Sequence, residues 1–136
     1  MLFVRVASSD DYSAIARIDE WHEVSPQLVA AGRCWVAGRK DQIEAFAISS
    51  CWFGAKPFVE VVFVAAMARR CGLGSALLAA IEATQPGTRL WITTGLQNLP
   101  MQQLLHARGY ELCGMIEKLA KVPELVYSRP IGPDGG

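Results

Sequence analysis

A basic, glycine-rich segment at residues 69–75 combines residue types that suit one kind of chemistry, the binding of a phosphate group. It reads Arg-Arg-Cys-Gly-Leu-Gly-Ser. Glycine has no side chain, so the backbone can approach a ligand closely. Guanidinium groups pair well with phosphate oxygens. The segment is therefore predicted to bind an anion, provided that the flanking elements aim its backbone N–H groups at the ligand.

The elements on either side of the segment meet that condition. Residues 58–64 form an apolar run typical of a buried strand, and residues 76–83 are typical of a helix. The turn thus leads into a helix N-terminus, where N–H groups lack intrahelical partners and the helix dipole is positive. Helix N-termini bind phosphate for this reason.

The rest of the chain predicts a mixed α/β fold with a mostly antiparallel sheet, in the order β-α-α-β-β-β-α-β-α-β-β. We expect one domain at residues 1–131 and a disordered tail at residues 132–136. The predicted strands are residues 2–7, 34–37, 43–52, 58–64, 89–94, 110–117 and 124–128. The predicted helices follow the cap at residues 8–11 to about residue 22, and cover residues 26–32, 76 to about 85, and 98–108.

Composition excludes several classes of protein. The chain has 136 residues, of which 51% are hydrophobic, and its 13 basic residues balance its 13 acidic ones. A net charge of zero gives no reason to expect nucleic acid or an acidic membrane as a partner. The longest apolar run, residues 61–68, is too short to span a bilayer. The early charge at Arg5 argues against a signal peptide.

The four cysteines form no Cys-x-x-Cys pair, and no histidine is placed to complete a zinc site, so no metal is expected. Reduced thiols are the rule in a cytoplasm, and we expect a cytoplasmic protein.

Two nucleotide-binding motifs fit the segment poorly. A dinucleotide-binding turn requires Gly or Ala where this chain has Leu77, and no acidic residue follows at the distance needed for ribose. A phosphate-binding P-loop requires Gly-Lys-Ser/Thr, which is absent.

A third pattern does match. Arg69-x-x-Gly72-x-Gly74 after a strand resembles the Gln/Arg-x-x-Gly-x-Gly/Ala motif of the GNAT acetyltransferase superfamily. The order of predicted elements also resembles the GNAT fold, so the resemblance covers nearly the whole chain.

A second motif of that family is recognisable farther along the chain. It runs Asn, Ala three residues later, Tyr seven later, and then Gly-Phe. Here Asn98 begins it, Met101 replaces the Ala, Leu105 replaces the Tyr, and Gly109-Tyr110 stand for Gly-Phe. The substitution at Leu105 matters because the family's tyrosine protonates the departing CoA thiolate.

The resemblance implies acetyl-CoA as acetyl donor. In the family, the strand before the turn splays from its neighbour, and the pantetheine arm lies in the gap like an added strand. The turn then holds the pyrophosphate. The residues implied to bind acetyl-CoA are Val62, Phe63, Val64, Arg69, Arg70, Cys71, Gly72, Leu73, Gly74, Ser75 and Asn98.

The resemblance also implies transfer of the acetyl group to a primary amine by direct attack. Residues 58–63 resemble the strand of the histone-acetylating branch whose glutamate is the base, which points to Glu60. Alternatively, Glu60 faces solvent or pairs with an arginine such as Arg5 or Arg89. Tyr127 is the candidate acid in place of the missing tyrosine, with Tyr110 as the other option.

For the acceptor pocket, Trp21 and Trp52 are the aromatic candidates, although both also suit a core position. The acceptor is a small molecule or a protein amine, and the resemblance is compatible with a homodimer. Two other functions remain open: a catalytically degenerate acetyl-CoA-binding module, and a different nucleotide-binding α/β domain.

Overall fold

The computed structural model describes residues 1–132, so Pro133 and the rest of the predicted tail lie outside the described residues. Seven strands form one mixed sheet in the spatial order β1-β2-β3-β4-β5-β7-β6. The strands are β1 (Leu2–Val6), β2 (Cys34–Arg39), β3 (Gln42–Trp52), β4 (Lys56–Val64), β5 (Arg89–Gly95), β6 (Glu111–Ile116) and β7 (Glu124–Pro130). The α-helices are α1 (Tyr12–Ile18), α2 (Pro26–Ala30), α3 (Leu73–Thr84) and α4 (Leu99–Ala107), with 3₁₀ turns at Ser9–Asp11 and Ala66–Ala68.

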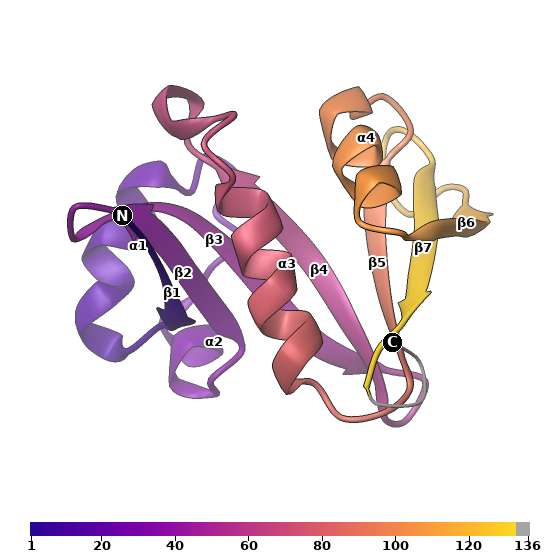
Figure 1. Cartoon of the computed structure of the whole chain (residues 1–136), viewed down its shortest axis with the longest axis horizontal. Coiled ribbons are helices and arrows are strands. Elements are labelled where there is room, and N and C mark those ends of the chain that lie inside the picture. The colour runs from indigo at the N-terminus through magenta and orange to yellow at the C-terminus, as the bar shows by residue number, and fades with distance from the viewer. Residues whose placement is uncertain (133–136) are drawn as a thin grey trace.

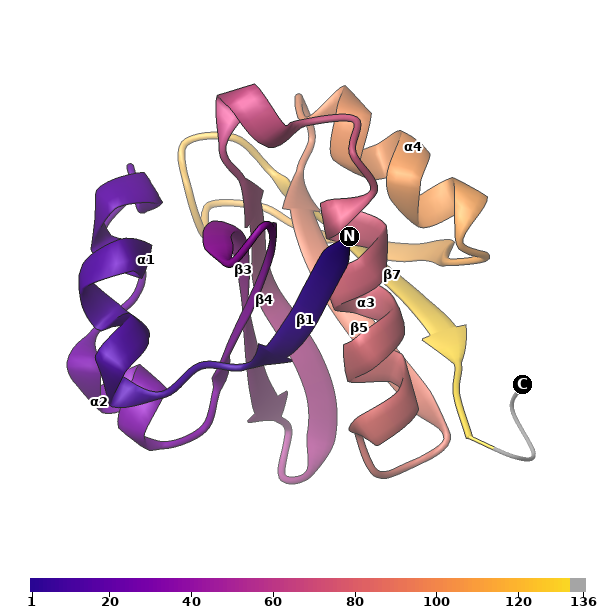
Figure 2. The same ribbon diagram turned by 60° about the vertical axis from the view of Figure 1, so that its left-hand side comes forward.

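The helices cover the two faces of the sheet. Helices α1 and α2 lie on one side of the sheet, and α3 and α4 lie on the other (Figures 1 and 2). Each layer encloses an apolar core. On the α3 side, Leu73, Leu77, Leu78 and Ile81 are buried at helical spacing against the sheet. On the α1 side, Ile15 is fully buried with residues of β2, β3 and β4.

The fold class and the order of elements predicted above are confirmed, and most bounds agree to within a few residues. The first helix is the main exception, because it ends at Ile18 and not near His22. The buried carboxylate of Asp19 accepts hydrogen bonds from the N–H groups of Glu23 (3.0 Å) and Val24 (2.8 Å). Asp19 therefore turns the chain out of the helix, which carries residues 20–24 toward the sheet.

Strands β4 and β5 run parallel but are paired over only two positions, Phe58 with Trp91 and Val59 with Ile92. Beyond Val59 they diverge, which is visible between β4 and β5 in Figure 1. On its other edge β4 has a bulge, because Ser49 pairs with Val59 and Ile48 with Val61, which leaves Glu60 as the extra residue. The splay expected from the family resemblance is thus present.

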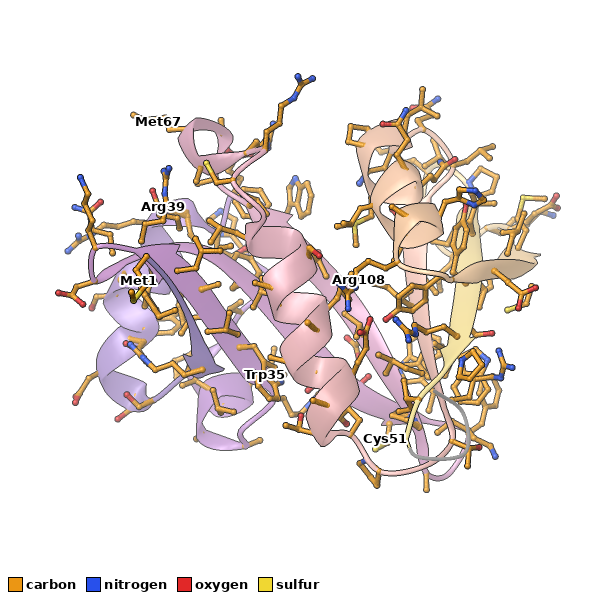
Figure 3. The ribbon with its side chains drawn as sticks, in the orientation of Figure 1. Met1, Trp35, Arg39, Cys51, Met67 and Arg108 are labelled. Atoms are coloured by element: carbon orange, nitrogen blue, oxygen red, sulfur yellow. The ribbon has the colours of Figure 1, made fainter. Side chains whose placement is uncertain are left out.

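A largely buried carboxylate, Glu82 on α3, links the two sides of this splay. It accepts hydrogen bonds from Arg108 at the end of α4, from the Tyr110 hydroxyl (2.7 Å) and from Arg129 on β7 (3.4 Å). Arg108 also donates to the Ser75 hydroxyl at 2.8 Å. Figure 3 shows Arg108 beside α3. We call these residues the Glu82 network.

No helix in the described part of the chain is both long and apolar enough to cross a membrane.

Candidate active site

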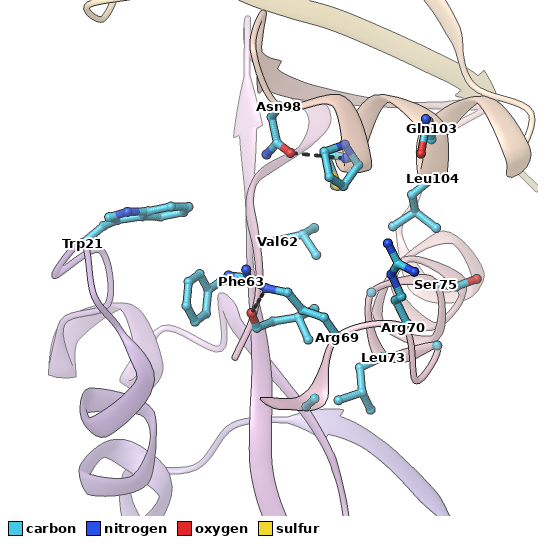
Figure 4. Close-up of a pocket in the computed structure, with 16 residues that line it drawn as sticks. Trp21, Val62, Phe63, Arg69, Arg70, Leu73, Ser75, Asn98, Gln103 and Leu104 are labelled. Atoms are coloured by element: carbon cyan, nitrogen blue, oxygen red, sulfur yellow. Dashed lines mark hydrogen bonds between the residues drawn. The ribbon is translucent and has the colours of Figure 1, made fainter. Parts of the chain in front are cut away.

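A cleft of about 870 Å³ opens where β4 and β5 separate. Its walls come from the end of β4, the turn before α3 and the first two turns of α4 (Figure 4). Ten of the eleven residues that the family resemblance implied for cofactor binding line it, Cys71 being the one that does not. The full lining is Trp21, Val62, Phe63, Val64, Ala68, Arg69, Arg70, Gly72, Leu73, Gly74, Ser75, Asn98, Pro100, Met101, Gln103 and Leu104.

The two glycines of the turn serve different purposes. Gly72 has φ of +83°, a left-handed conformation that other residues adopt only with strain, and a side chain there would meet open space. Gly74 lies in the first turn of α3, where an added Cβ would be 3.1 Å from Leu104 Cδ2. Gly72 therefore shapes the turn, and Gly74 allows α3 to approach α4 closely. The N–H groups of the turn and the first turn of α3 have no intrahelical acceptor.

The charged and thiol side chains of the turn point in different directions. Arg69 donates through Nε to the Val64 carbonyl at 3.1 Å and so lies against the end of β4. Arg70 extends from the turn toward α4 (Figure 4). Cys71 points away from the cleft, since its sulfur accepts a hydrogen bond from Arg39 Nη1 at 3.1 Å. Of these side chains, only the two arginines can meet an anion in the cleft.

Asn98 caps helix α4 at the opposite wall. Its side-chain oxygen accepts a hydrogen bond from the N–H of Met101 at 3.2 Å, and Pro100 occupies a position in the first turn where its missing N–H costs nothing. The Asn98 oxygen is thus committed to the helix cap, while the side-chain amide nitrogen remains a donor beside the cleft.

A second pocket of about 460 Å³ adjoins the cleft on the α1 side of the splay. The two share Trp21, Val62, Asn98 and Met101. The rest of the second pocket is Glu23, Glu60, Val61, Thr93, Thr94, Gly95, Gln97, Val122 and Glu124. Three carboxylates and no Arg, Lys or His stand in this lining of described residues.

Trp21, an acceptor-pocket candidate of the sequence analysis, lies at the junction of the two hollows. Its ring meets Phe63 edge to face, with centroids 5.3 Å apart. The Asp19 hydrogen bonds described above hold the loop that carries both Trp21 and Glu23. Trp52 does not line either hollow, so the prediction that it touches the acceptor is not supported. Its ring stacks on Phe58 at 4.7 Å.

Glu60 lines the second pocket but is already engaged. Its Oε2 accepts hydrogen bonds from Arg33 Nη2 (3.1 Å) and from the Trp52 indole N–H (3.3 Å). Arg33 is itself held by the Ser49 carbonyl, to which its Nε donates at 3.0 Å. Glu60 thus pairs with an arginine, as the alternative interpretation expected, but the partner is Arg33 and not Arg5 or Arg89.

Glu124, the first residue of β7, is a pocket residue that the sequence did not reveal. It pairs across the strands with Gly95, and its Oε2 lies 3.5 Å from the position that a Cβ would occupy there. Burial raises the pKa of the Glu124 carboxyl above the usual value for glutamate, and a hydrogen-bonding contact with the Thr93 side chain lowers it by less. The absence of a side chain at Gly95 leaves room for this carboxylate.

The structure does not bring a tyrosine to either hollow among the described residues. Tyr127, the candidate acid, is only 9% exposed and belongs to the core on the α3 side. It faces that core because it pairs with the buried Ile92 across the strands. The hydroxyl of Tyr110 is bound to Glu82, and Leu105 is fully buried. The structure therefore places Tyr127, the predicted acid, in the core and away from both hollows.

The fold and the site together define an α/β protein that opens a cleft between two splayed parallel strands. The sequence model described as "Acetyltransferase (GNAT) family" matches residues 4–110. The chain belongs to the GNAT acetyltransferase family. Compared with curated protein sequences, it has no significant match.

Solved structures give the same fold. A GNAT-family acetyltransferase from Bacillus cereus is 25% identical, with a TM-score of 0.88 over 98% of this chain and 99% of that one. The ribosomal-protein-S18-alanine N-acetyltransferase from Escherichia coli is 17% identical, with a TM-score of 0.80 over 98% and 96%. YncA from Salmonella typhimurium, a putative acetyltransferase solved with its cofactor acetyl-CoA, is 18% identical, with a TM-score of 0.77 over 96% and 94%.

Proposed function

We propose that this protein transfers an acetyl group from acetyl-CoA to a primary amine. The observation that carries the proposal is the junction of two hollows at the splay of β4 and β5. One is lined by a basic turn at a helix N-terminus, and the other is lined by carboxylates. The first suits a phosphate-bearing donor, and the second suits a cationic acceptor.

The cleft fits acetyl-CoA in three respects. The N–H groups of residues 71–75 surround a helix N-terminus, which favours the pyrophosphate, and Arg69 and Arg70 add positive charge. The edge of β4 beyond Val59 has no strand partner on the β5 side, so Val62, Phe63 and Val64 can take up the pantetheine arm by strand addition. When bound, acetyl-CoA supplies an acyl group activated as a thioester.

The second pocket would receive the amine. An alkylammonium ion is attracted to a pocket lined by Glu23, Glu60 and Glu124 with Trp21 at its mouth. Arg33 and Trp52 fix the orientation of the Glu60 carboxylate, so we assign Glu60 to holding the amine. This assignment replaces the hypothesis that Glu60 is the base.

The test measures release of CoA from acetyl-CoA with a panel of primary amines, together with calorimetry of acetyl-CoA binding. The panel includes small monoamines, diamines, amino acids and a peptide with an N-terminal alanine. The peptide is included because of the fold shared with the S18-alanine enzyme. We expect turnover with at least one cationic amine. Failure to bind acetyl-CoA would contradict the proposal.

A second function has one observation in its favour. The family's tyrosine is replaced by the buried Leu105, and no tyrosine among the described residues reaches the cleft. A protein that binds acetyl-CoA without transferring its acetyl group would show tight binding and no CoA release with any amine in the panel. A thiolate leaves readily near neutral pH, however, since thiol pKa values are about 8.5. Transfer therefore does not require an acid, and we favour the enzyme.

A further inference from the structure

We propose that Glu124 is the general base that removes a proton from the acceptor ammonium, and that Glu60 is a positioning residue in the same pocket. The inference rests on the proposed acetyltransferase function and adds the identity of the group that activates the amine. The two carboxylates lie on opposite sides of the splay, Glu60 on β4 and Glu124 on β7 beside β5. Both line the second pocket, so both belong to the site proposed for the amine.

The hydrogen bonds of the two carboxylates separate their roles. Glu60 Oε2 already accepts from Arg33 and Trp52, and a proton placed on that atom would disrupt both hydrogen bonds. Glu124 has no ion pair with an arginine or lysine among the described residues. Its carboxylate lies over Gly95, at the open end of the splay. Of the two, Glu124 is therefore the carboxylate that, within residues 1–132, has no charged hydrogen-bond partner to compete with an incoming proton.

The surroundings of Glu124 also favour proton uptake. Thr93, Thr94 and Gly95 face the pocket from β5 and carry no charge. The other titratable groups that line the pocket, Glu23 and Glu60, are both acidic. Burial raises the pKa of Glu124. A carboxylate base works best when its pKa approaches the working pH, because it then accepts a proton more readily from the substrate.

One base is enough to account for every proton that moves in the reaction. The acceptor enters as an ammonium, and Glu124 takes one proton and later returns it to solvent. The freed lone pair on nitrogen forms the N–C bond to the acetyl carbonyl, and the C–S bond breaks with its electron pair on sulfur. The nitrogen loses a second proton, which neutralises the thiolate. The products are the amide and CoA thiol.

The first experiment compares Glu124→Gln, Glu124→Asp and Glu60→Gln on the best amine of the panel. Glu117→Gln, an exposed glutamate seven residues before Glu124, is the matched control. We expect Glu124→Gln to lower kcat about 100-fold, a usual size for the loss of a general base. Glu124→Asp should recover part of the rate. Glu60→Gln should raise KM for the amine more than it lowers kcat.

The pH profile supplies the test of role. In the wild type the rate should rise with pH as the Glu124 carboxyl loses its proton, and Glu124→Gln should remove this rise. Acetyl-CoA affinity by calorimetry should be unchanged in all four variants. If Glu124→Gln keeps the wild-type rate and pH profile, or if Glu60→Gln alone removes the rise, the assignment is overturned.

A second readout needs no acceptor. Carbon-13 NMR of glutamate-labelled protein follows each side-chain carboxyl, and the Glu124 signal is the one missing from Glu124→Gln. We expect it to titrate above the usual range for a glutamate carboxyl, and titration within that usual range would overturn the inference. A wild type that binds acetyl-CoA but acetylates no amine would overturn the proposed function and the base together. An active wild type with an unimpaired Glu124→Gln would overturn the base alone.

Discussion

At the scale of single residues, the two glycines of the basic turn have separable roles. We expect Gly72→Ala to strain the left-handed turn by about 1 kcal/mol, and to weaken acetyl-CoA binding because the N–H groups of the turn shift. Gly74→Ala should change stability little, since the gain in helix propensity offsets the displacement of Leu104. Urea unfolding and calorimetry measure both effects.

Gly114→Ala is the control, because an added Cβ there meets nothing within 4 Å and the residue lies outside the cleft. Equal acetyl-CoA affinity in Gly72→Ala and Gly114→Ala would contradict the role assigned to the turn.

The residues of the proposed donor site could be predicted from the sequence because they are close together along the chain. The turn, its strand and its helix are consecutive, so local patterns place them. The proposed acceptor site is different. The partner of Glu60, Arg33, is 27 residues away, and Glu124 is 64 residues beyond Glu60. Neither relation has a local signal, and the inward orientation of Tyr127 has none either, because the face that a strand residue occupies depends on the neighbouring strands.

At the scale of elements, the bounds of the strands and helices follow from periodicity, but the order of strands in the sheet does not. The last strand of the chain, β7, lies between β5 and β6. This insertion places Glu124 opposite Gly95, and no pattern within residues 111–130 indicates it. The early end of α1 has a local cause, because the Asp19 carboxylate accepts hydrogen bonds from the N–H groups of residues 23 and 24. Periodicity alone predicts a longer helix, because Ile15, Ile18 and Trp21 keep helical spacing past this point.

The same two hydrogen bonds lead to a prediction about the loop of residues 19–24. Asp19→Ala leaves two backbone N–H groups without their acceptor, one of them on the buried Val24. We expect a loss of about 1–3 kcal/mol in the free energy of unfolding. KM for the amine should rise because Trp21 and Glu23 lose their support, while acetyl-CoA affinity changes less. Glu20→Ala, at an exposed position of the same loop, should leave all three quantities near wild type.

At the scale of the whole molecule, the sheet consists of two parts that share a narrow seam. Strands β1 to β4 form one antiparallel part, and β5, β7 and β6 form the other. Two paired positions join them between β4 and β5. The Glu82 network adds a second connection, from α3 to α4 and β7. The cleft therefore lies where the two parts share only two paired positions, while the core around α3 packs against both of them.

This arrangement predicts how stability responds to Glu82→Gln and to the donor. The substitution leaves Arg108 and Arg129 without their shared carboxylate. We expect the free energy of unfolding to fall by about 2 kcal/mol, the usual contribution of hydrogen bonds to charged groups. Acetyl-CoA at 100 times its Kd should raise the free energy of unfolding by about 2.7 kcal/mol, because it binds the folded protein only. Thermal unfolding with and without acetyl-CoA measures both quantities, and Glu117→Gln is the control.

If the network only braces the two parts, the ligand stabilises the variant as much as the wild type at equal saturation. A variant that unfolds like wild type but binds acetyl-CoA poorly would instead show that Arg108 acts on the turn through Ser75.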